Sequence, residues 1–245
     1  MLKSFRPYFM TLKTRDWVAK NVKNNKATAA MPSALKQAGI NELEMHSDTL
    51  HMKEITGASI IRLHSGGSIQ QTKSGQFDLP EQTGRCSGDN PAVLCLRPLE
   101  WLLVSETLEI DELRQRVQRQ INGKLLSIND NSDGLALFRL SGKGAGWLLS
   151  KLSGLDYLAG AEDGEHCTRT KVGHIAVIIH YHQVSPDQFV FDLVLDRSMA
   201  KYLWQLLSAS VPHADELAIA YGAGIFAGMT GSHKKKVDIS HGDDL

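Results

Sequence analysis

The chain contains 245 residues, 42% hydrophobic and 22% charged, which allows one large domain or two small ones around an apolar core. Its formal net charge is zero, so it lacks the long-range attraction to nucleic acids or anionic membranes that their usual partners have. No apolar run is long enough to cross a bilayer, and no signal-peptide pattern is visible at the N-terminus. We therefore expect a globular protein that binds neither nucleic acid nor membrane.

The three cysteines, Cys86, Cys95 and Cys167, indicate a reducing compartment. They form no CxxC pair, and an odd number without metal-ligand spacing is typical of free thiols. A cytoplasmic localisation is the expectation that follows.

Residues 1–30 differ in composition from the rest of the chain. They hold seven Lys or Arg and one acidic residue, Asp16, with aromatic residues at no steady spacing. Such a segment is either a loose basic extension or an arm that docks on a partner or a membrane surface. A third reading makes Met31 the genuine first residue, because the regular part of the chain opens just after it.

The next hundred residues predict strands, a surface loop and one helix. Residues 58–63 alternate as a strand, whereas residues 72–90 are poor in apolar side chains and are expected to form a surface loop. Residues 93–96 and 101–104 predict a strand pair joined by a turn. Apolar residues at helical spacing then mark a helix over residues 110–121.

Residues 133–155, DGLALFRLSGKGAGWLLSKLSGL, predict a strand, a glycine-rich turn and a helix. The nearly continuous apolar run at 135–140 is typical of a strand that is buried on both faces. Ser141 is expected to cap the start of the helix, and Gly154 is expected to end it in the left-handed conformation.

A second strand–turn–strand–helix unit follows, with strands at 175–181 and 189–195 and a helix capped by Asp196 or Ser198. Because the same unit also precedes the central segment, the sequence predicts an α+β fold with ferredoxin-like repeats, an antiparallel sheet with helices on one face. We expect this domain to span residues 31–213. Residues 214–245 are then expected to be a C-terminal tail, partly disordered.

Two motifs suggest chemistry, and neither is complete. The run GKGAG at 142–146 lies between a strand and a helix, as phosphate-binding loops do, but it lacks the GxxxxGK[ST] and GxGxxG patterns. A plain strand-to-helix turn is the preferred interpretation. His174, His180 and His182 share one strand face if the alternation holds, but no acidic residue lies beside them in the same strand. We therefore expect no metal site and no catalytic residue.

Four stretches of the chain, taken in order, resemble the gamma subunit of heterotetrameric sarcosine oxidase. They are LRPLEWLLV at 96–104, LFRLSGKGAGWLLSKLSGLDYLAG at 137–160, HCTRTKVGHIAVIIHY at 166–181 and DLVLDRSMAKYLWQLL at 192–207. In that family the corresponding features are an LGPDEWLL segment, a strand with SGPxA and a leucine-rich helix, a C-x-x-T-R-like segment, and a strand pair before a Ser-x-x-x-x-LW helix. The order and spacing of the stretches carry the resemblance, which covers residues 33–210.

The gamma family in turn resembles the folate-binding domain of the glycine-cleavage T-protein, an aminomethyltransferase, and the resemblance implies that fold. The T-protein pattern has a catalytic aspartate at the start of the strand that matches residues 176–181, where this chain has Ala176 or Val177. Folate chemistry needs a carboxylate near the reacting nitrogen, so the resemblance implies the fold without the catalysis. It also implies that FAD, FMN, NAD, zinc and tetrahydrofolate belong to other subunits and that this chain holds no cofactor.

Two functions follow from the resemblance. The first is a non-catalytic gamma subunit that works with alpha, beta and delta subunits to convert sarcosine to glycine, while the complex passes the one-carbon unit to tetrahydrofolate and forms hydrogen peroxide. A partner would then cover loop 72–90 and exposed Trp101, Trp147 or Trp204, although core packing is preferred for Trp204. The second is a stand-alone folate or one-carbon binding protein, with Arg139 and Arg169 at the mouth of its pocket.

Overall fold

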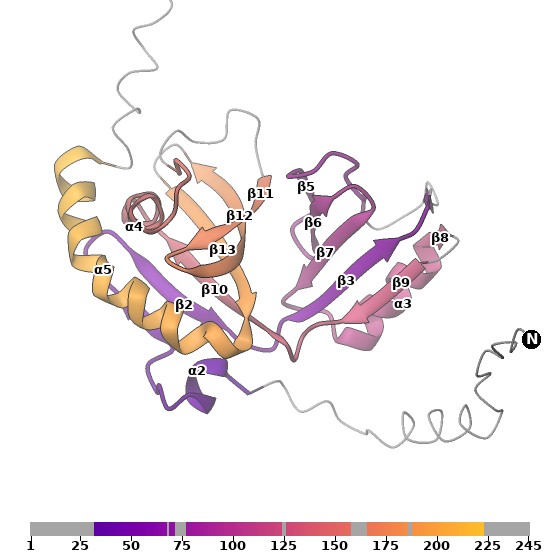
Figure 1. The fold of residues 1–245 in the computed structure, drawn as a ribbon, viewed down its shortest axis with the longest axis horizontal. Helices are drawn as coiled ribbons and strands as arrows, with labels where there is room; N and C mark the ends of the chain where they lie inside the picture. Colours follow the sequence, from indigo (N-terminus) through magenta and orange to yellow (C-terminus); the bar gives the residue numbers. More distant parts are fainter. Residues whose placement is uncertain are drawn as a thin grey trace, which may run out of the picture. The chain divides into compact units, whose positions relative to one another are not determined.

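The computed structural model describes residues 32–67, 69–71, 77–123, 126–157, 166–185 and 188–222 (Figure 1). The predicted extension at 1–30 and residues 223–245 of the predicted tail lie outside the described residues. The described part is an α+β domain with two antiparallel sheets, as the sequence predicts for fold class. None of its helices is long and apolar enough to span a membrane. None of the three cysteines forms a disulfide bond.

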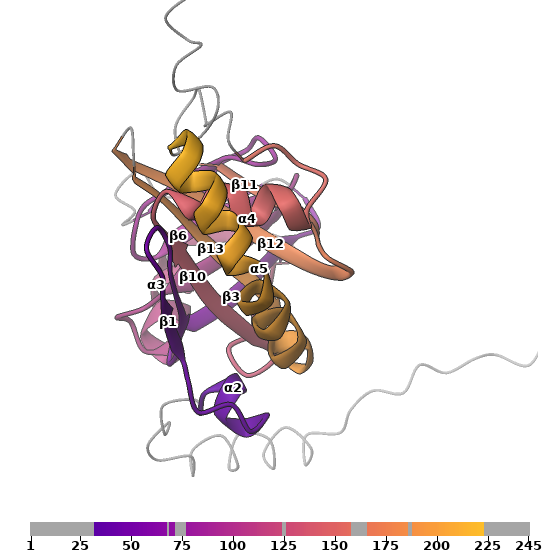
Figure 2. The same cartoon turned by 90° about the vertical axis from the view of Figure 1, so that its left-hand side faces the viewer.

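The larger sheet has six antiparallel strands in the order β1-β2-β10-β13-β12-β11. Its strands are β1 (Glu44–His46), β2 (His51–Ile55), β10 (Leu135–Ser141), β11 (His166–Val172), β12 (Ile175–Ser185) and β13 (Gln188–Asp196). Helices α4 (Gly144–Leu152) and α5 (Ala200–Tyr221) lie across its outer face, and the short α2 (Ala34–Gln37) packs beside α5 (Figures 1 and 2). Fully buried Phe138 and Leu140 of β10 join Leu148 of α4 and Leu203 of α5 in this core.

The smaller sheet has five antiparallel strands in the order β5-β6-β7-β3-β9. Its strands are β3 (Ser59–Ser65), β5 (Cys86–Ser87), β6 (Ala92–Arg97), β7 (Glu100–Ser105) and β9 (Leu126–Asp130). Helix α3 (Ile110–Gln120) covers its outer face, where Leu113 and Val117 pack against Ile61 and Leu63. The remaining elements are a two-stranded antiparallel sheet of β4 (Ile69–Gln71) and β8 (Ile121–Gly123), and the 3-10 turn η1 (Arg197–Met199).

The inner faces of the two sheets pack against each other, so the layers run helix, sheet, sheet, helix (Figure 1). Alternate residues of one strand therefore belong to different cores. In β10, Phe138 points to the helices whereas Leu137 contacts the other sheet. In β6, Val93 packs under α3 whereas Leu94 faces the larger sheet. This double burial explains why the strands are such continuous apolar runs.

The smaller sheet is an insertion into the larger one. Its strands come from one continuous segment, residues 59–130, which leaves after β2 and returns at β10. Strands β2 and β10 are paired with each other, with Ile55 opposite Leu137, so the inserted segment begins and ends at the same place. The backbone N–H of Asn131 donates to the carbonyl of Ile60 at 2.8 Å and closes its base.

A buried glutamate stabilises the β6–β7 hairpin. Glu100 is 1% exposed, and its carboxylate accepts hydrogen bonds from Arg62, at 2.7 Å from Nε, and from Arg97. Burial by itself would raise the pKa of Glu100, but the hydrogen bonds and charges of the two arginines outweigh it and lower that pKa.

Three sequence predictions about the architecture are corrected. Both strand–turn–strand–helix units exist, as β6–β7–α3 and β12–β13–α5, but they lie in different sheets and do not form ferredoxin-like repeats of one sheet. Of the predicted surface loop at 72–90, residues 72–76 lie outside the described residues, and the remainder contributes Phe77 and Leu79 to the core under α3. Helix α5 continues past the predicted boundary at 213 to Tyr221, because Ala214 and Ala218 remain buried against the larger sheet.

The turn between β10 and α4 uses its glycines differently from the prediction. Ser141 is the last residue of β10 and not the helix cap, and Gly154 does not adopt a positive φ. The special position is Gly142, with φ 103°, where a Cβ atom would lie 2.3 Å from the carbonyl oxygen of Thr49. The same carbonyl accepts the backbone N–H of Gly144 at 3.1 Å and so satisfies the start of α4.

Candidate functional site

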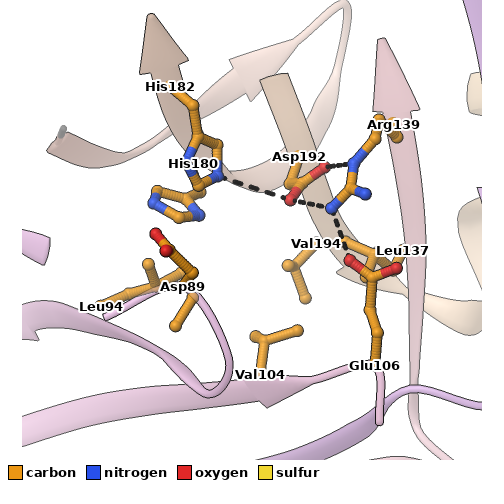
Figure 3. A pocket seen from close by; sticks show the side chains of 11 residues that line it. Asp89, Leu94, Val104, Glu106, Leu137, Arg139, His180, His182, Asp192 and Val194 are labelled. Atoms are coloured by element: carbon orange, nitrogen blue, oxygen red, sulfur yellow. Dashed lines mark hydrogen bonds and ion pairs between the residues drawn. The ribbon is translucent and has the colours of Figure 1, made fainter. Parts of the chain in front are cut away.

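A small cavity lies between the two sheets and is lined by several charged side chains (Figure 3). Its volume is about 40 Å³, which is room for an ion or a few water molecules. Apolar and charged side chains from both sheets line it, namely Asp89, Ala92, Leu94, Val104, Glu106, Leu137, Arg139, His180, His182, Asp192 and Val194.

An ion pair forms the centre of the cavity wall. Arg139 of β10 and Asp192 of β13 are directly opposite each other in the strand register. The Arg139 Nε donates to Asp192 Oδ1 at 2.7 Å, and a terminal nitrogen donates to Oδ2 at 2.7 Å, a bidentate pair. The same guanidinium reaches across to Glu106 of the smaller sheet at 2.7 Å. One arginine thereby links the two sheets through two carboxylates.

Asp192 stays ionised although it is only 7% exposed. Burial alone would raise the pKa of Asp192, but hydrogen bonds from Arg139 and His182, with the nearby positive charge, lower it to about 2. The pKa of Arg139 is raised, chiefly by its hydrogen bonds to Asp192. The pair is therefore charged over the whole physiological pH range.

Two histidines from β12 complete the cluster. His180 pairs with Asp192 in the β12–β13 register, and His182 lies two residues further along, on the same face. The two imidazole rings have their centroids 3.6 Å apart, and His182 Nε2 lies 3.7 Å from Asp192 Oδ2. One ligand atom from each of the three side chains lies within 4.8 Å of the others. Figure 3 shows Asp192 between the two histidines on one side and Arg139 on the other.

The structure brings some of the residues that the sequence singled out to the cavity and places the others elsewhere. Arg139 lines the cavity, whereas Arg169 is exposed on β11, at the edge of the sheet, and is not part of the lining. His174 is exposed in the turn before β12, away from the alternating pattern of the strand. The sequence pattern did not point to Asp192, because this residue lies on β13 and not on the strand that carries the histidines. The turn after Gln183 was the available signal, since folding the hairpin there places residue 192 opposite residue 180.

The glycine-rich turn at 142–146 is already filled by protein. The Thr49 carbonyl accepts the first free N–H of α4, and a side chain at Gly144 would meet the Thr49 hydroxyl at 2.4 Å. The glycines are explained by this close approach of the chain, and the preferred interpretation as a plain turn agrees with the geometry.

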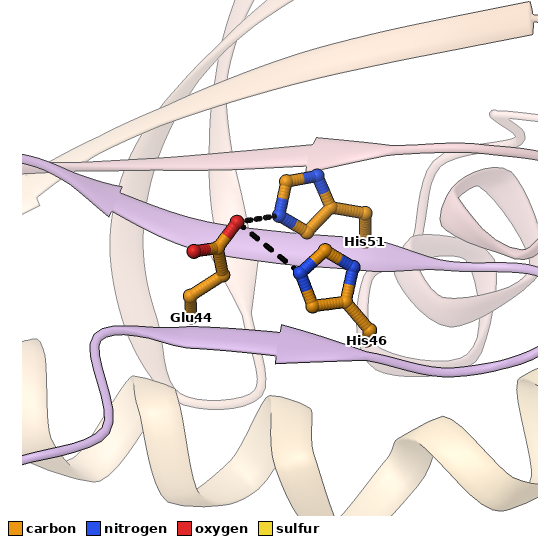
Figure 4. Close-up of side chains that lie close together, drawn as sticks. All are labelled: Glu44, His46 and His51. Carbon is orange, nitrogen blue, oxygen red and sulfur yellow. Dashed lines mark hydrogen bonds and ion pairs between the residues drawn. The ribbon is translucent and has the colours of Figure 1, made fainter.

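A second group of titratable side chains lies on the surface, where Glu44, His46 and His51 meet across the β1–β2 hairpin (Figure 4). Nε2 of His46 lies 3.2 Å from Oε1 of Glu44, and the two rings are stacked with centroids 4.1 Å apart. A hydrogen bond from His51 is the main reason that the pKa of Glu44 is lowered. Glu44 and His46 are exposed, so this cluster lacks the dry walls of the cavity.

The tryptophans expected at a partner surface are core residues. Trp101, Trp147 and Trp204 are 3%, 7% and 5% exposed, so the prediction that a partner covers them is wrong, while the preferred core placement of Trp204 is confirmed. Their positions are fixed from inside the chain, since Trp101 donates to the Pro80 carbonyl at 2.7 Å and Trp147 to the Gly222 carbonyl at 2.9 Å.

Fold and cavity together define an α+β domain of two face-to-face antiparallel sheets, each with helices outside, around an ion-paired centre. Neither a protein-family model nor a curated protein sequence matches the chain. A chain of the heterotetrameric sarcosine oxidase from Corynebacterium sp. U-96, solved in complex with pyrrole 2-carboxylate, is similar with a TM-score of 0.60 and 19% identity; the match covers 75% of this chain and 95% of that one. The glycine cleavage system aminomethyltransferase T from Bartonella henselae is similar with a TM-score of 0.44 and 17% identity, over 65% of this chain and 45% of that one. The domain thus has the fold of a sarcosine oxidase chain, as the sequence resemblance predicts.

Proposed function

We propose that this chain is the non-catalytic gamma-type subunit of a sarcosine oxidase complex, with alpha, beta and delta subunits as partners. The observation that carries the proposal is the match to a chain of heterotetrameric sarcosine oxidase over 95% of that chain's length. The complex would convert sarcosine to glycine, pass the one-carbon unit to tetrahydrofolate and form hydrogen peroxide. The cofactors of that reaction would reside on the other subunits, namely FAD, FMN, NAD, zinc and tetrahydrofolate. The complex would be cytoplasmic.

The small size of the inner cavity supports the proposal that this chain does not bind or transform folate. Sites for drug-sized ligands and cofactors measure roughly 300–1,000 Å³. The cavity between the sheets is about 40 Å³, and its arginine, Arg139, is held by Asp192 and Glu106. A folate would have to displace these partners and separate the sheets. This disfavours the stand-alone folate-binding alternative.

The start of β12 supports the same conclusion. The T-protein resemblance places a catalytic aspartate there, and this chain has exposed Ala176 and buried Val177 at that point. Neither side chain can accept a proton or orient a reacting nitrogen. The fold would then serve as a structural part of the complex while other subunits carry out the reaction.

Co-purification tests the proposal directly. The full chain is tagged in its native cell, isolated under mild conditions, and the accompanying chains are identified by mass spectrometry. We expect stoichiometric chains that carry flavin and sarcosine oxidase activity. A lone chain that retains a folate would instead support the alternative, and a lone chain without ligand would contradict both functions.

The isolated chain provides the complementary test. After gel filtration it should show no flavin absorbance and should not oxidise sarcosine, while activity appears in fractions that contain the accompanying chains. Sarcosine oxidation by the isolated chain would refute the non-catalytic role.

A further inference from the structure

The cluster of His180, His182 and Asp192 has the composition of a transition-metal site. Two imidazoles and one carboxylate, with positions left open for water, form a common ligand set for zinc and for other divalent ions of similar softness. Hard ions such as Mg²⁺ and Ca²⁺ prefer sites made of oxygen ligands alone. The ligand chemistry therefore favours the zinc class over the alkaline-earth ions.

The distances within the cluster fit such an ion with small side-chain movements. With bonds of about 2.0–2.1 Å in a tetrahedral site, neighbouring ligand atoms lie about 3.4 Å apart. His182 Nε2 and Asp192 Oδ2 are 3.7 Å apart, which is close to the separation of two ligands of one ion. All three ligand atoms fall within 4.8 Å of one another. Side-chain displacements of a few tenths of an ångström to about 1 Å would bring the three ligand atoms to the coordination distance.

Burial and strand register hold the three side chains in place. His180 is 2% exposed and Asp192 is 7% exposed, and they are direct cross-strand partners. Leu94, Leu137 and Val194 line the same cavity, so apolar side chains lie beside the polar groups. A site built on paired strands has little freedom to rearrange, so the ligands are preorganised.

The surrounding charges match a divalent cation. Arg139 holds both oxygens of Asp192 and so fixes the orientation of the carboxylate, as hydrogen-bonding partners of metal ligands commonly do. Asp192 and Glu106 give two negative charges against the single positive charge of Arg139. Asp89 adds a further negative charge, and Figure 3 shows its carboxylate pointing toward His180 from the loop before β6. The net charge of the cavity is then −2 with neutral histidines.

We propose that His180, His182 and Asp192 bind one divalent transition-metal ion of the zinc class between the two sheets, with Asp89 in the opposite wall of the cavity. The ion would join the strands β12 and β13 of the larger sheet at the cavity. The site belongs to this chain alone and does not depend on the proposed subunit function.

Zinc titration of the purified full chain tests the proposal. The chain is stripped with a chelator and titrated with Zn²⁺ against a chromophoric competitor, with Mg²⁺ in a parallel experiment. The double variant His46→Gln/His51→Gln removes the surface cluster and should still bind one Zn²⁺ per chain. Adding His182→Gln to this background should weaken binding by about tenfold or more, and Mg²⁺ should not bind at the cavity.

Two results would overturn the proposal: a His46→Gln/His51→Gln variant that binds no Zn²⁺, or one whose affinity is unchanged by His182→Gln. If His182→Gln does not fold, carbethoxylation of histidines in the unmodified chain replaces it. Zn²⁺ should then protect His182, whose side chain is 19% exposed, and leave the 50% exposed side chain of His213 reactive. Equal reactivity of His182 with and without Zn²⁺ would refute the site.

Discussion

Substitution of Gly142 by alanine should be among the most destabilising single changes in the β10–α4 turn. Two effects add at this residue. A φ of 103° is a conformation that residues with a Cβ rarely adopt, which costs roughly 1–3 kcal/mol. The new Cβ would also lie 2.3 Å from the Thr49 carbonyl oxygen, and relieving such an overlap with backbone costs about 1–3 kcal/mol more. The free energy of unfolding should therefore fall by about 2–6 kcal/mol.

Two other glycines separate the effects. Gly57 has φ 77° but no atom within 4 Å of an added Cβ, so Gly57→Ala should show the conformational cost alone, about 1–2 kcal/mol. Gly154 has neither a positive φ nor a nearby atom, and Gly154→Ala should change stability by less than about 0.5 kcal/mol. Urea unfolding followed by far-ultraviolet circular dichroism measures the free energy of unfolding of all three variants, with one shared dependence on urea concentration. A loss for Gly142→Ala no larger than that for Gly57→Ala would refute the close approach of Thr49.

Three further predictions concern the cores and the ion pairs. Leu148→Ala removes a fully buried side chain under α5 and should lower the free energy of unfolding by about 2–5 kcal/mol. The control Leu155→Ala, at a 41% exposed position, should change it little. A loss below about 1 kcal/mol for Leu148→Ala would mean that the apolar face of α4 is misassigned. Arg139→Met leaves Asp192 buried without its arginine partner and should lower the free energy of unfolding by about 2–4 kcal/mol. The double variant Arg139→Met/Asp192→Leu should recover a large part of that loss, because it also removes the buried charge. Equal losses in the two variants would show that the unpaired charge of Asp192 is not the cause of the destabilisation. The pKa of Glu100 is lower in the folded state, so its contribution to stability is complete above the unfolded pKa near 4.5 and is lost as pH falls through the folded pKa. In Glu100→Gln the free energy of unfolding should therefore depend less on pH below about 4.5. An unchanged pH dependence would contradict this assignment.

Strand positions could be predicted from the sequence because side chains alternate with a period of two. The alternation predicted for residues 58–63 puts Ile61 and Leu63 on one face and Ile60 on the other. In the structure the first two lie in the core under α3, and Ile60 lies in the contact between the sheets. Alternation says which residues share a face, but it does not say which strand lies alongside. The division into two sheets therefore could not be predicted, since it depends on pairings such as β2 with β10, far apart in the chain.

The candidate site shows the same limit at the level of single residues. Arg139 and the two histidines of β12 were visible as unusual polar residues in apolar strands. What joins them is Asp192, which comes from the returning strand of the hairpin and interrupts an otherwise apolar run. The registers of two strand pairs, β10 with β13 and β12 with β13, are needed to bring the four side chains together. Composition and local spacing do not contain that information.

The inserted position of the smaller sheet has a consequence for how the domain opens. If residues 59–130 lose their structure, β2 and β10 remain hydrogen-bonded, and the insert becomes only a long loop in a hairpin that stays closed. The larger sheet also retains more core, 27 buried residues against 11 under α3 among the described residues. Amide hydrogen exchange should therefore show two tiers, with β3, β6 and β7 opening at lower free energy than β10 and β13. Each such opening would expose the histidines and Asp192, so local unfolding of the insert provides a route by which an ion enters or leaves.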